Sequence, residues 1–287
     1  MEMKLNFFTG SENFPFAIHY GHHDEDLVMH HHSDFSELTI VLDGKAEHCV
    51  NDEVYTITKG DIFVIGKGIY HGYKNPEHFR ICNVMFRPEA LLNEDYDVKK
   101  CAGYHALFLV EPAINASQGF KARLKLRIDD FLRLEELIAV SIDEFNNDNP
   151  GRNTLLTAYF LHIVTFLSRL YTTSARHREI DNIANAAAFM ESNYMNDISI
   201  SSLLDVSHYS QRHFIRLFSE IYNTTPQKYL LGIRINQACR LLRETRLPVT
   251  DISSQCGFND PNYFSRAFKK ATGRSPLSFR AASRSGM

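Results

Sequence analysis

Residues 257–270 read Gly257-Phe258-Asn259-Asp260-Pro261-Asn262-Tyr263-Phe264-Ser265-Arg266-Ala267-Phe268-Lys269-Lys270. Asp260 is a good N-cap, and Pro261 then falls at the first helical position, where its missing N–H costs nothing. Phe264 and Phe268 are four residues apart, so a helix places both rings on one face for burial. The stretch therefore predicts a turn followed by a capped, amphipathic helix.

A second copy of this pattern lies earlier in the chain. Leu203–Phe218 aligns with Ile252–Phe268, so the two starts are 49 residues apart and the two closing phenylalanines 50. Each copy predicts a short helix, a turn and a capped second helix, with Ser210 as the N-cap in the earlier copy. Between the copies, Pro226 to about Leu242 predicts a helix of ~17 residues, or ~25 Å. Such a helix can hold the two second helices about one DNA turn apart.

The outward faces of the two second helices are polar and basic. They carry Gln211, Arg212, Ile215 and Arg216 in the first copy, and Asn262, Ser265, Arg266 and Lys269 in the second. Arg and Asn are the side chains that bind guanine and adenine edges bidentately, and a helix-turn-helix presents this face to the major groove. A single Arg is most often a solvated surface charge, but two aligned copies favour DNA binding.

The charge distribution separates this region from the rest of the chain. The chain has 287 residues and a net charge of −3. Residues 1–175 contain 16 Lys+Arg against 25 Asp+Glu, whereas residues 176–287 contain 15 against 9. The length suggests about two domains, and the basic one fits a polyanionic partner.

Residues 180–280 resemble the DNA-binding module of the AraC/XylS family of bacterial transcription regulators. The stretch quoted above, with Ile252 before it and Gly273-Arg274-Ser275-Pro276 and Arg280 after it, matches that family's signature. The resemblance implies two helix-turn-helix units that read adjacent major-groove segments. It places these residues at base-facing positions: Gln211, Arg212, Ile215, Arg216, Pro261, Asn262, Tyr263 and Arg266.

The sequence departs from the family at three framework positions. Leu204 and Ser253 stand where the family usually has Ala, and Asn223 stands where it usually has Gly. Asn tolerates the left-handed conformation, so we expect the turn at Asn223 to be kept. Ile215 is apolar at a base-facing position and can contact a thymine methyl group. We expect Lys269 to contact phosphate.

Residues from about 5 to 112 have the pattern of a β-domain. Leu38, Ile40 and Leu42 alternate with other residues, as in a half-buried strand, and short apolar runs follow at 62–65 and 81–86. Asp43-Gly44 and Asn51-Asp52 are hairpin signals. Many short strands predict a small barrel or sandwich.

Two apolar stripes at helical spacing follow, at 128–142 and 155–170, separated by an Asn-, Pro- and Gly-containing stop at 146–151. They predict an antiparallel helical hairpin. Its stripes either pack on the β-domain or form a dimer seam, and both alternatives remain open. Residues 172–178 are small and polar and predict a linker.

Eleven of the 14 histidines lie in residues 1–175. His30 and His32 share one face of a strand, and with Glu37 and His71 they form a set common at transition-metal sites. The arrangement resembles the two motifs of the cupin barrel, with departures at Asp24 and Gly66. Three interpretations compete, namely a metal-dependent enzyme, an effector-binding pocket and a purely structural interior.

Other features of the sequence bear on where the protein is found in the cell. No run of 18 apolar residues exists, so we expect no membrane span, and the first residues lack a signal peptide. The five cysteines are odd in number and unpaired in spacing, which fits the reducing cytoplasm.

We therefore predict an α+β multidomain protein. Residues 1–120 form a cupin-type β-barrel (double-stranded β-helix) that binds an effector. Residues 121–175 form a helical hairpin for homodimerisation, and 176–287 form an all-α DNA-binding domain. The predicted function is sequence-specific, effector-controlled transcription regulation without enzymatic activity.

Fusion to a DNA-binding module favours sensing, and residues 30–37 most resemble the rhamnose-responsive regulators, which implies a monosaccharide effector. The alternative is a cupin enzyme that uses a divalent transition metal at His30, His32, Glu37 and His71. Activation and repression both remain open, and activation would add RNA polymerase as a partner.

Overall fold

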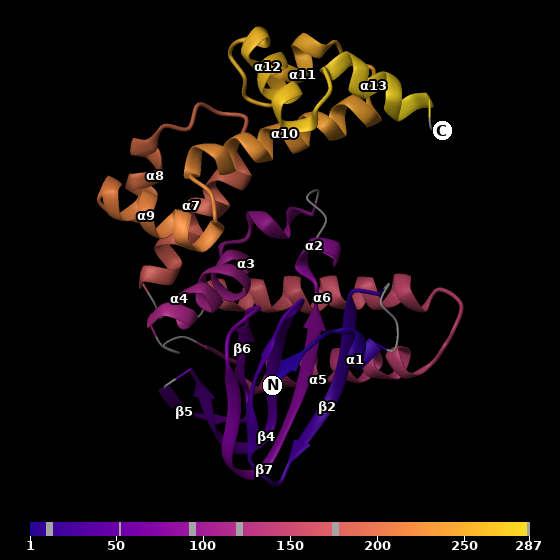
Figure 1. Cartoon of the computed structure of the whole chain (residues 1–287), viewed down its shortest axis with the longest axis vertical. Coiled ribbons are helices and arrows are strands. Elements are labelled where there is room, and N and C mark those ends of the chain that lie inside the picture. The colour runs from indigo at the N-terminus through magenta and orange to yellow at the C-terminus, as the bar shows by residue number, and fades with distance from the viewer. Residues whose placement is uncertain (10–13, 52, 92–95, 119–122, 174–177, 286–287) are drawn as a thin grey trace. The chain divides into compact units, whose positions relative to one another are not determined.

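The computed structural model describes residues 1–9, 14–51, 53–91, 96–118, 123–173 and 178–285 (Figure 1). The chain forms two compact units, Met1–Ala184 and Asn185–Met287. The first is rich in strands and the second is helical, which confirms the predicted α+β fold class. The domain limits 1–120, 121–175 and 176–287 stay a prediction.

The first unit contains eight strands among the described residues. They are β1 (Glu2–Met3), β2 (Phe16–His23), β3 (Leu27–His32), β4 (Ser36–Val50), β5 (Glu53–Thr58), β6 (Asp61–Ile65), β7 (His71–Phe86) and β8 (Leu124–Lys125). The strand order is β1-β3-β7-β4-β6-β8, with β2 also on β7 and β5 on β4. The two longest strands, β4 and β7, pair from Ser36–Phe86 to Val50–His71. Aromatic and branched side chains fill the space that the strands enclose.

The two hairpin signals have different outcomes. Strands β4 and β5 pair up to Val50 and Glu53, so the chain reverses at Asn51 as predicted, while residue 52 lies outside the described part. The hairpin at Asp43-Gly44 is wrong, because both residues lie within β4. The pairing of β4 with β7 shifts register there, and a Cβ on Gly44 would lie 2.2 Å from the Glu77 carbonyl oxygen. Glycine at this position therefore lets the backbones of the paired strands β4 and β7 approach each other closely.

The β pattern predicted up to residue 112 is wrong beyond Phe86. That segment forms the short helices α2 (Pro88–Leu91), η1 (Asp97–Lys100), α3 (Ala102–His105), η2 (Ala106–Val110) and α4 (Glu111–Gln118). Residues 103–108 are all buried, since α3 and η2 contact α6 and η2 also contacts β6. A segment that is apolar on every side carries no period that distinguishes a strand from a helix.

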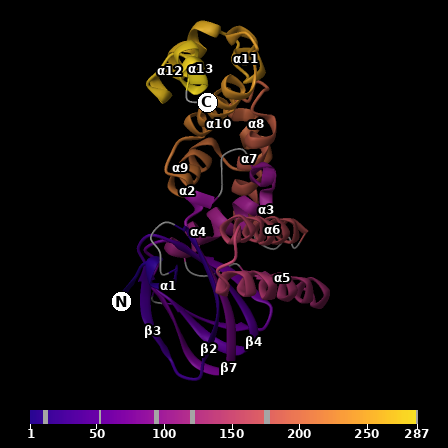
Figure 2. The same cartoon turned by 90° about the vertical axis from the view of Figure 1, so that its right-hand side faces the viewer.

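The predicted helical hairpin is present as α5 (Ile128–Asn146) and α6 (Arg152–Thr173). Helix α5 contacts β2 and α6, and both helices lie alongside the strands (Figures 1 and 2). Helix α6 is long and apolar enough to cross a membrane by length and composition alone, although Phe160, Ile163 and Val164 are fully buried within the unit. The predicted linker is shorter than 172–178, because α6 ends at Thr173 and the next helix begins at Arg178. Residues 174–177 lie outside the described part.

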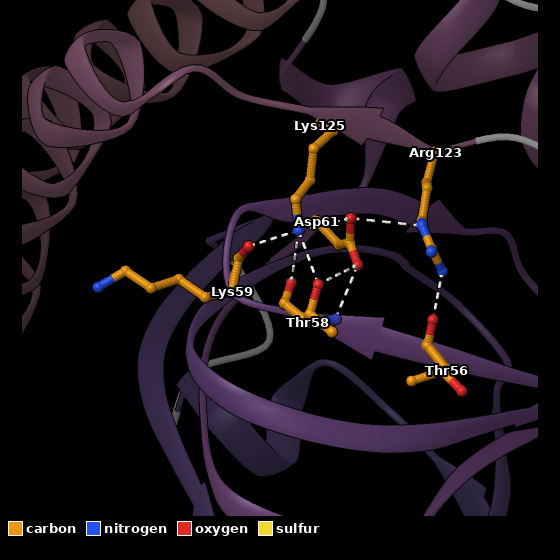
Figure 3. A network of polar contacts seen from close by, with 6 residues as sticks. All are labelled: Thr56, Thr58, Lys59, Asp61, Arg123 and Lys125. Carbon is orange, nitrogen blue, oxygen red and sulfur yellow. Dashed lines mark hydrogen bonds and ion pairs between the residues drawn. The ribbon is translucent and has the colours of Figure 1, made fainter.

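A polar network fastens β8 to the barrel directly before α5 (Figure 3). The buried Asp61 carboxylate lies 3.3 Å from Arg123 Nε and 3.2 Å from Lys125 Nζ, and it accepts a 2.7 Å hydrogen bond from the Thr58 amide. Lys125 also donates to the Lys59 carbonyl oxygen at 2.6 Å. A buried carboxylate needs charged or hydrogen-bonding partners, and these contacts hold the chain against β6 shortly before α5 begins at Ile128.

The described residues beyond 178 form helices only, in agreement with the predicted all-α domain. The helices are α7 (Arg178–Asn193), α8 (Ile200–Ser207), α9 (Gln211–Tyr222), α10 (Pro226–Glu244), α11 (Val249–Gln255), α12 (Pro261–Thr272) and α13 (Pro276–Ser285). Phe264 and Phe268 are fully buried against α10 and α11. Each such ring contributes about 1.5–3 kcal/mol to stability.

Candidate functional site

Helices α9 and α12 are the second helices of two helix-turn-helix units, as the repeat predicts. Helix α9 follows α8, and α12 follows α11 after a short turn. The inner face of α9 buries Phe214, Leu217 and Phe218, and that of α12 buries Phe264 and Phe268. The opposite, polar face of each helix carries exposed side chains.

The structure exposes nearly all of the predicted DNA-facing side chains. The exposed ones are Gln211, Arg212, Arg216, Pro261, Asn262, Tyr263, Arg266 and Lys269, and Ile215 is half-buried. On α9, the Arg216 guanidinium forms an ion pair of 2.9 Å with Glu220, one turn further along the helix. Both side chains are more than half exposed, and exposed pairs of this kind are weak. Arg216 can therefore exchange Glu220 for a phosphate or a base.

The turns that hold the two helices are built differently. In the second helix-turn-helix unit, the Asp260 carboxylate accepts a hydrogen bond of 2.8 Å from the Asn262 amide, and Pro261 follows as the first helical residue. In the first unit, Ser210 stands at the N-cap but makes no capping hydrogen bond. Asn223 ends α9 with φ of 52°, so the turn predicted for this departure from Gly is kept.

Gly257 and Arg234 pack the second helix-turn-helix unit against the residues that follow α7. Gly257 has φ of 79°, and a Cβ there would lie 2.5 Å from the Tyr194 carbonyl oxygen. The Arg234 guanidinium donates to the carbonyl oxygens of Tyr194 and Asn196, both at 2.8 Å. The family signature contains Gly257, whereas nothing in the sequence singles out Arg234.

The barrel brings the predicted histidines together. The ligand atoms of His30, His32 and His71 all lie within 4.8 Å of one another, and all three residues are buried. The Nε2 atoms of His71 and His32 are 3.3 Å apart. Burial lowers the pKa of His32 to about 3 and that of His71 well below its usual value, and the neighbouring His30 lowers both further. Burial lowers the pKa of His30 as well, so the neutral form is favoured for all three imidazoles.

Glu37 completes the predicted set. Its Oε2 lies 3.7 Å from His32 Nε2, and its Oε1 accepts a hydrogen bond of 3.1 Å from the Thr39 hydroxyl. Burial raises the pKa of Glu37 to about 7, and the Thr39 hydrogen bond lowers it in part. Since burial favours the neutral form of both partners, the contact with His32 is not a strong ion pair.

Two further residues that sequence reasoning missed face the same interior. His48 Nε2 lies 3.4 Å from His71 Nδ1, and the Tyr73 ring centroid lies 5.2 Å from that of His48. Burial lowers the pKa of His48 to about 3. Neither residue occupies a position of the cupin motifs, so only the register of β4 and β7 brings them to the site.

The donor set fits a divalent transition metal. Three neutral imidazoles and one carboxylate suit zinc, iron, nickel or copper, and coordination requires imidazoles without a proton on the binding nitrogen. His30 meets this requirement, since a carbonyl oxygen only accepts and the Val28 oxygen lies 3.1 Å from His30 Nδ1. The proton of His30 is thus on Nδ1, and Nε2 is available. The same groups can instead bind the hydroxyls of a small polar molecule.

Comparisons with known proteins agree with both units. A model of a helix-turn-helix domain matches residues 203–282, and a model of a cupin domain matches residues 17–85. The HTH-type transcriptional activator RhaR of Mannheimia succiniciproducens is 27% identical over 277 residues, covering 94% of this chain and 93% of that protein. RhaR of Escherichia coli K12 is 30% identical over 264 residues, covering 89% and 88%.

A solved structure is also similar to this chain. The DNA-binding domain in the crystal structure of AdpA in complex with a target DNA has a sequence 28% identical to this chain. Its TM-score is 0.36, and the match covers 36% of this chain and 94% of that chain.

The two domain matches define a DNA-binding transcription regulator with a cupin domain. The chain belongs to the AraC family of regulators, together with the RhaR activators.

Proposed function

We propose that the barrel of this regulator binds a small polar effector, a monosaccharide such as rhamnose. We further propose that this binding changes the affinity of the compact unit Asn185–Met287 for DNA. The observation that carries the proposal is the convergence of buried polar groups inside the barrel. Among the described residues, the buried Nδ1 of His32 has no hydrogen-bond partner. Such groups cost free energy unless a ligand or water binds them, and a polyhydroxylated ligand supplies both donors and acceptors.

The named relatives support rhamnose as the first effector to test, because they are RhaR activators. Control requires that the effector bind two states of the protein with different affinity. The family and its named relatives favour activation in the cytoplasm, with RNA polymerase as a further partner. We assign base contacts to Gln211, Arg212, Ile215, Arg216, Pro261, Asn262, Tyr263 and Arg266, and a phosphate contact to Lys269.

We further propose that α5 forms the dimer interface. Ile128, Leu132 and Val140 on this helix are 76%, 53% and 46% exposed, while Phe131, Leu134 and Ile138 are buried within the unit. Helix α5 thus has one apolar face packed and another uncovered, which accounts for the width of the stripe. Leu132→Glu should shift the protein to monomers in sedimentation equilibrium. Val54→Glu, at an equally exposed valine on β5, should not.

The second candidate function is a metal-dependent cupin enzyme, which the trio of His30, His32 and His71 favours. The relatives are named as regulators, which supports sensing over turnover. In either case the metal would be held by the trio and Glu37, and it would supply a cationic centre for ligand oxygens.

Two measurements separate these functions. A thermal-shift screen of monosaccharides should show stabilisation by one sugar, and His71→Ala should abolish that shift. Metal analysis of the purified protein tests the enzyme. Absence of bound metal, together with unchanged effector affinity in His30→Ala and His71→Ala, would exclude the enzyme and remove these histidines from the effector site.

A further inference from the structure

His48 is a fourth histidine buried in the barrel interior, and one of its ring nitrogens approaches His71 of the trio. His48 Nε2 lies 3.4 Å from His71 Nδ1, on the side of the His71 ring away from His32. The His48 ring is stacked on Phe63, with centroids 4.6 Å apart, and it lies beside Tyr73. These aromatic neighbours hold the imidazole in one orientation, so its nitrogen is a fixed partner for His71.

The proton of His71 determines which nitrogen can bind a ligand. A neutral imidazole carries one N–H, so His71 is protonated either on Nδ1 or on Nε2. With the proton on Nδ1, His71 donates to His48 and presents a bare Nε2 to the trio. With the proton on Nε2, that nitrogen donates towards His32 and coordinates nothing. The hydrogen bond at the other nitrogen selects between these forms.

His30 shows the same arrangement with a backbone acceptor. Its Nδ1 donates to the Val28 carbonyl oxygen at 3.1 Å, which leaves Nε2 for the site. His71 Nδ1 lies against the His48 imidazole instead. Metal-binding histidines in general donate their second N–H to a carboxylate, a carbonyl or water, and the loss of that partner weakens metal binding 10–100-fold.

We propose that His48 accepts the Nδ1–H of His71 and thereby fixes Nε2 of His71 as the atom that binds a divalent transition metal. His48 is a positioning residue in this role, because it does not itself contact the metal. The proposal rests on the proposed metal site of the trio and Glu37, and it adds a residue that the cupin motifs do not contain.

The test compares His48→Leu and His48→Gln with the parent chain, using Zn²⁺ and a competing chromophoric chelator. His48→Leu removes the acceptor and should weaken Zn²⁺ binding about 10–100-fold. His48→Gln keeps an acceptor oxygen and should restore much of the affinity. His31→Leu is the matched control, since His31 lies between two site residues but its ring packs on Tyr70 instead. Unchanged Zn²⁺ affinity in a folded His48→Leu would overturn the proposal.

A second measurement needs no metal. Long-range proton–nitrogen correlation spectra of the metal-free parent chain report which nitrogen of His71 carries the proton. The proposal predicts the Nδ1–H form, and an Nε2–H form would overturn it even if His48→Leu fails to fold. A parent chain that binds no Zn²⁺ but shows the Nδ1–H form would refute the proposed metal site and leave the hydrogen bond from His71 to His48 in place.

Discussion

The barrel interior and the outer faces of α9 and α12 place polar side chains in opposite environments. His32, His71 and His48 are fully buried among aromatic rings, whereas Arg266 and Lys269 point into solvent. Solvated arginine and lysine cost nothing in the free protein and remain available for DNA. Buried imidazoles lower the stability of the barrel and are tolerated where a ligand uses them. We therefore expect pH and ligands to change the stability of the first compact unit. Salt and base sequence should instead change the DNA affinity of the second compact unit.

The largest expected effect is the loss of barrel stability in acid. Burial lowers the pKa of His32 and His48 to about 3 and that of His105 to about 4. In each case the unfolded chain takes up the proton first, so stability falls as the pH drops below 6.5. Between pH 7 and 5 each histidine costs about 2 kcal/mol.

Glu37 acts in the opposite direction over the same range. Its pKa is raised to about 7, so the folded chain binds this proton first and gains about 2 kcal/mol on the same acidification. His71, whose pKa also lies well below its usual value, adds to the loss from the other histidines, and the resulting fall in stability can be measured by urea unfolding at a series of pH values. His105→Phe should make the dependence shallower, and a flat profile in the parent chain would contradict the neutral, buried histidines.

The next effect belongs to the exposed face. Arg266→Ala should relax base preference at one position of the DNA site and cost about 1–3 kcal/mol there, with an unchanged melting temperature. Selection from a random DNA pool, followed by affinity measurements on single-base variants, tests this. Arg243→Ala is the charge-matched control, because Arg243 lies near the end of α10 and donates to the Cys239 carbonyl oxygen. If Arg266→Ala keeps the parent's base preference, the second unit does not read DNA through this residue.

Capping distinguishes the two helix-turn-helix units in stability. Asp260→Ala removes a capping hydrogen bond of 2.8 Å. It should lower the free energy of unfolding of the compact unit Asn185–Met287 by about 1 kcal/mol. Ser210 makes no such bond, so Ser210→Ala should cost clearly less than Asp260→Ala. Equal losses in urea unfolding would mean that Ser210 caps α9 in solution.

The smallest effect is expected at Lys269. A phosphate contact carries no base information, so Lys269→Ala should weaken binding to all sequences alike. The slope of log affinity against log salt should become shallower by about one. An unchanged slope would remove this side chain from the DNA contacts.

The same contrast explains how much could be predicted from the sequence. The helix-turn-helix units follow from local signals, namely Pro261 after Asp260 and paired phenylalanines at helical spacing, and the structure has both units where the repeat predicts them. His30, His32, Glu37 and His71 are predicted as a set through the motif spacing, and the fold brings them together. His48 could not be predicted, because its approach to His71 depends on the pairing of β4 with β7.

Two local signals were overridden by the tertiary structure. Asp43-Gly44 has the composition of a hairpin turn, but it serves as an irregularity inside β4, where the backbone of β7 passes too close for a side chain. Residues 103–108, in the segment after Phe86, are helical and buried against α6 and β6. In both places a long-range contact, absent from any short window of sequence, determines the conformation.

The most direct test of the central claim is the affinity of the full chain for a selected DNA site with and without rhamnose, titrated in the parent and in His71→Ala. We expect the sugar to change the parent's DNA affinity severalfold or more, as for a coupling free energy of about 1–3 kcal/mol, and to leave the DNA affinity of His71→Ala unchanged. If neither rhamnose nor any other monosaccharide in the screen changes the parent's DNA affinity at any concentration, the barrel does not control DNA binding through a sugar.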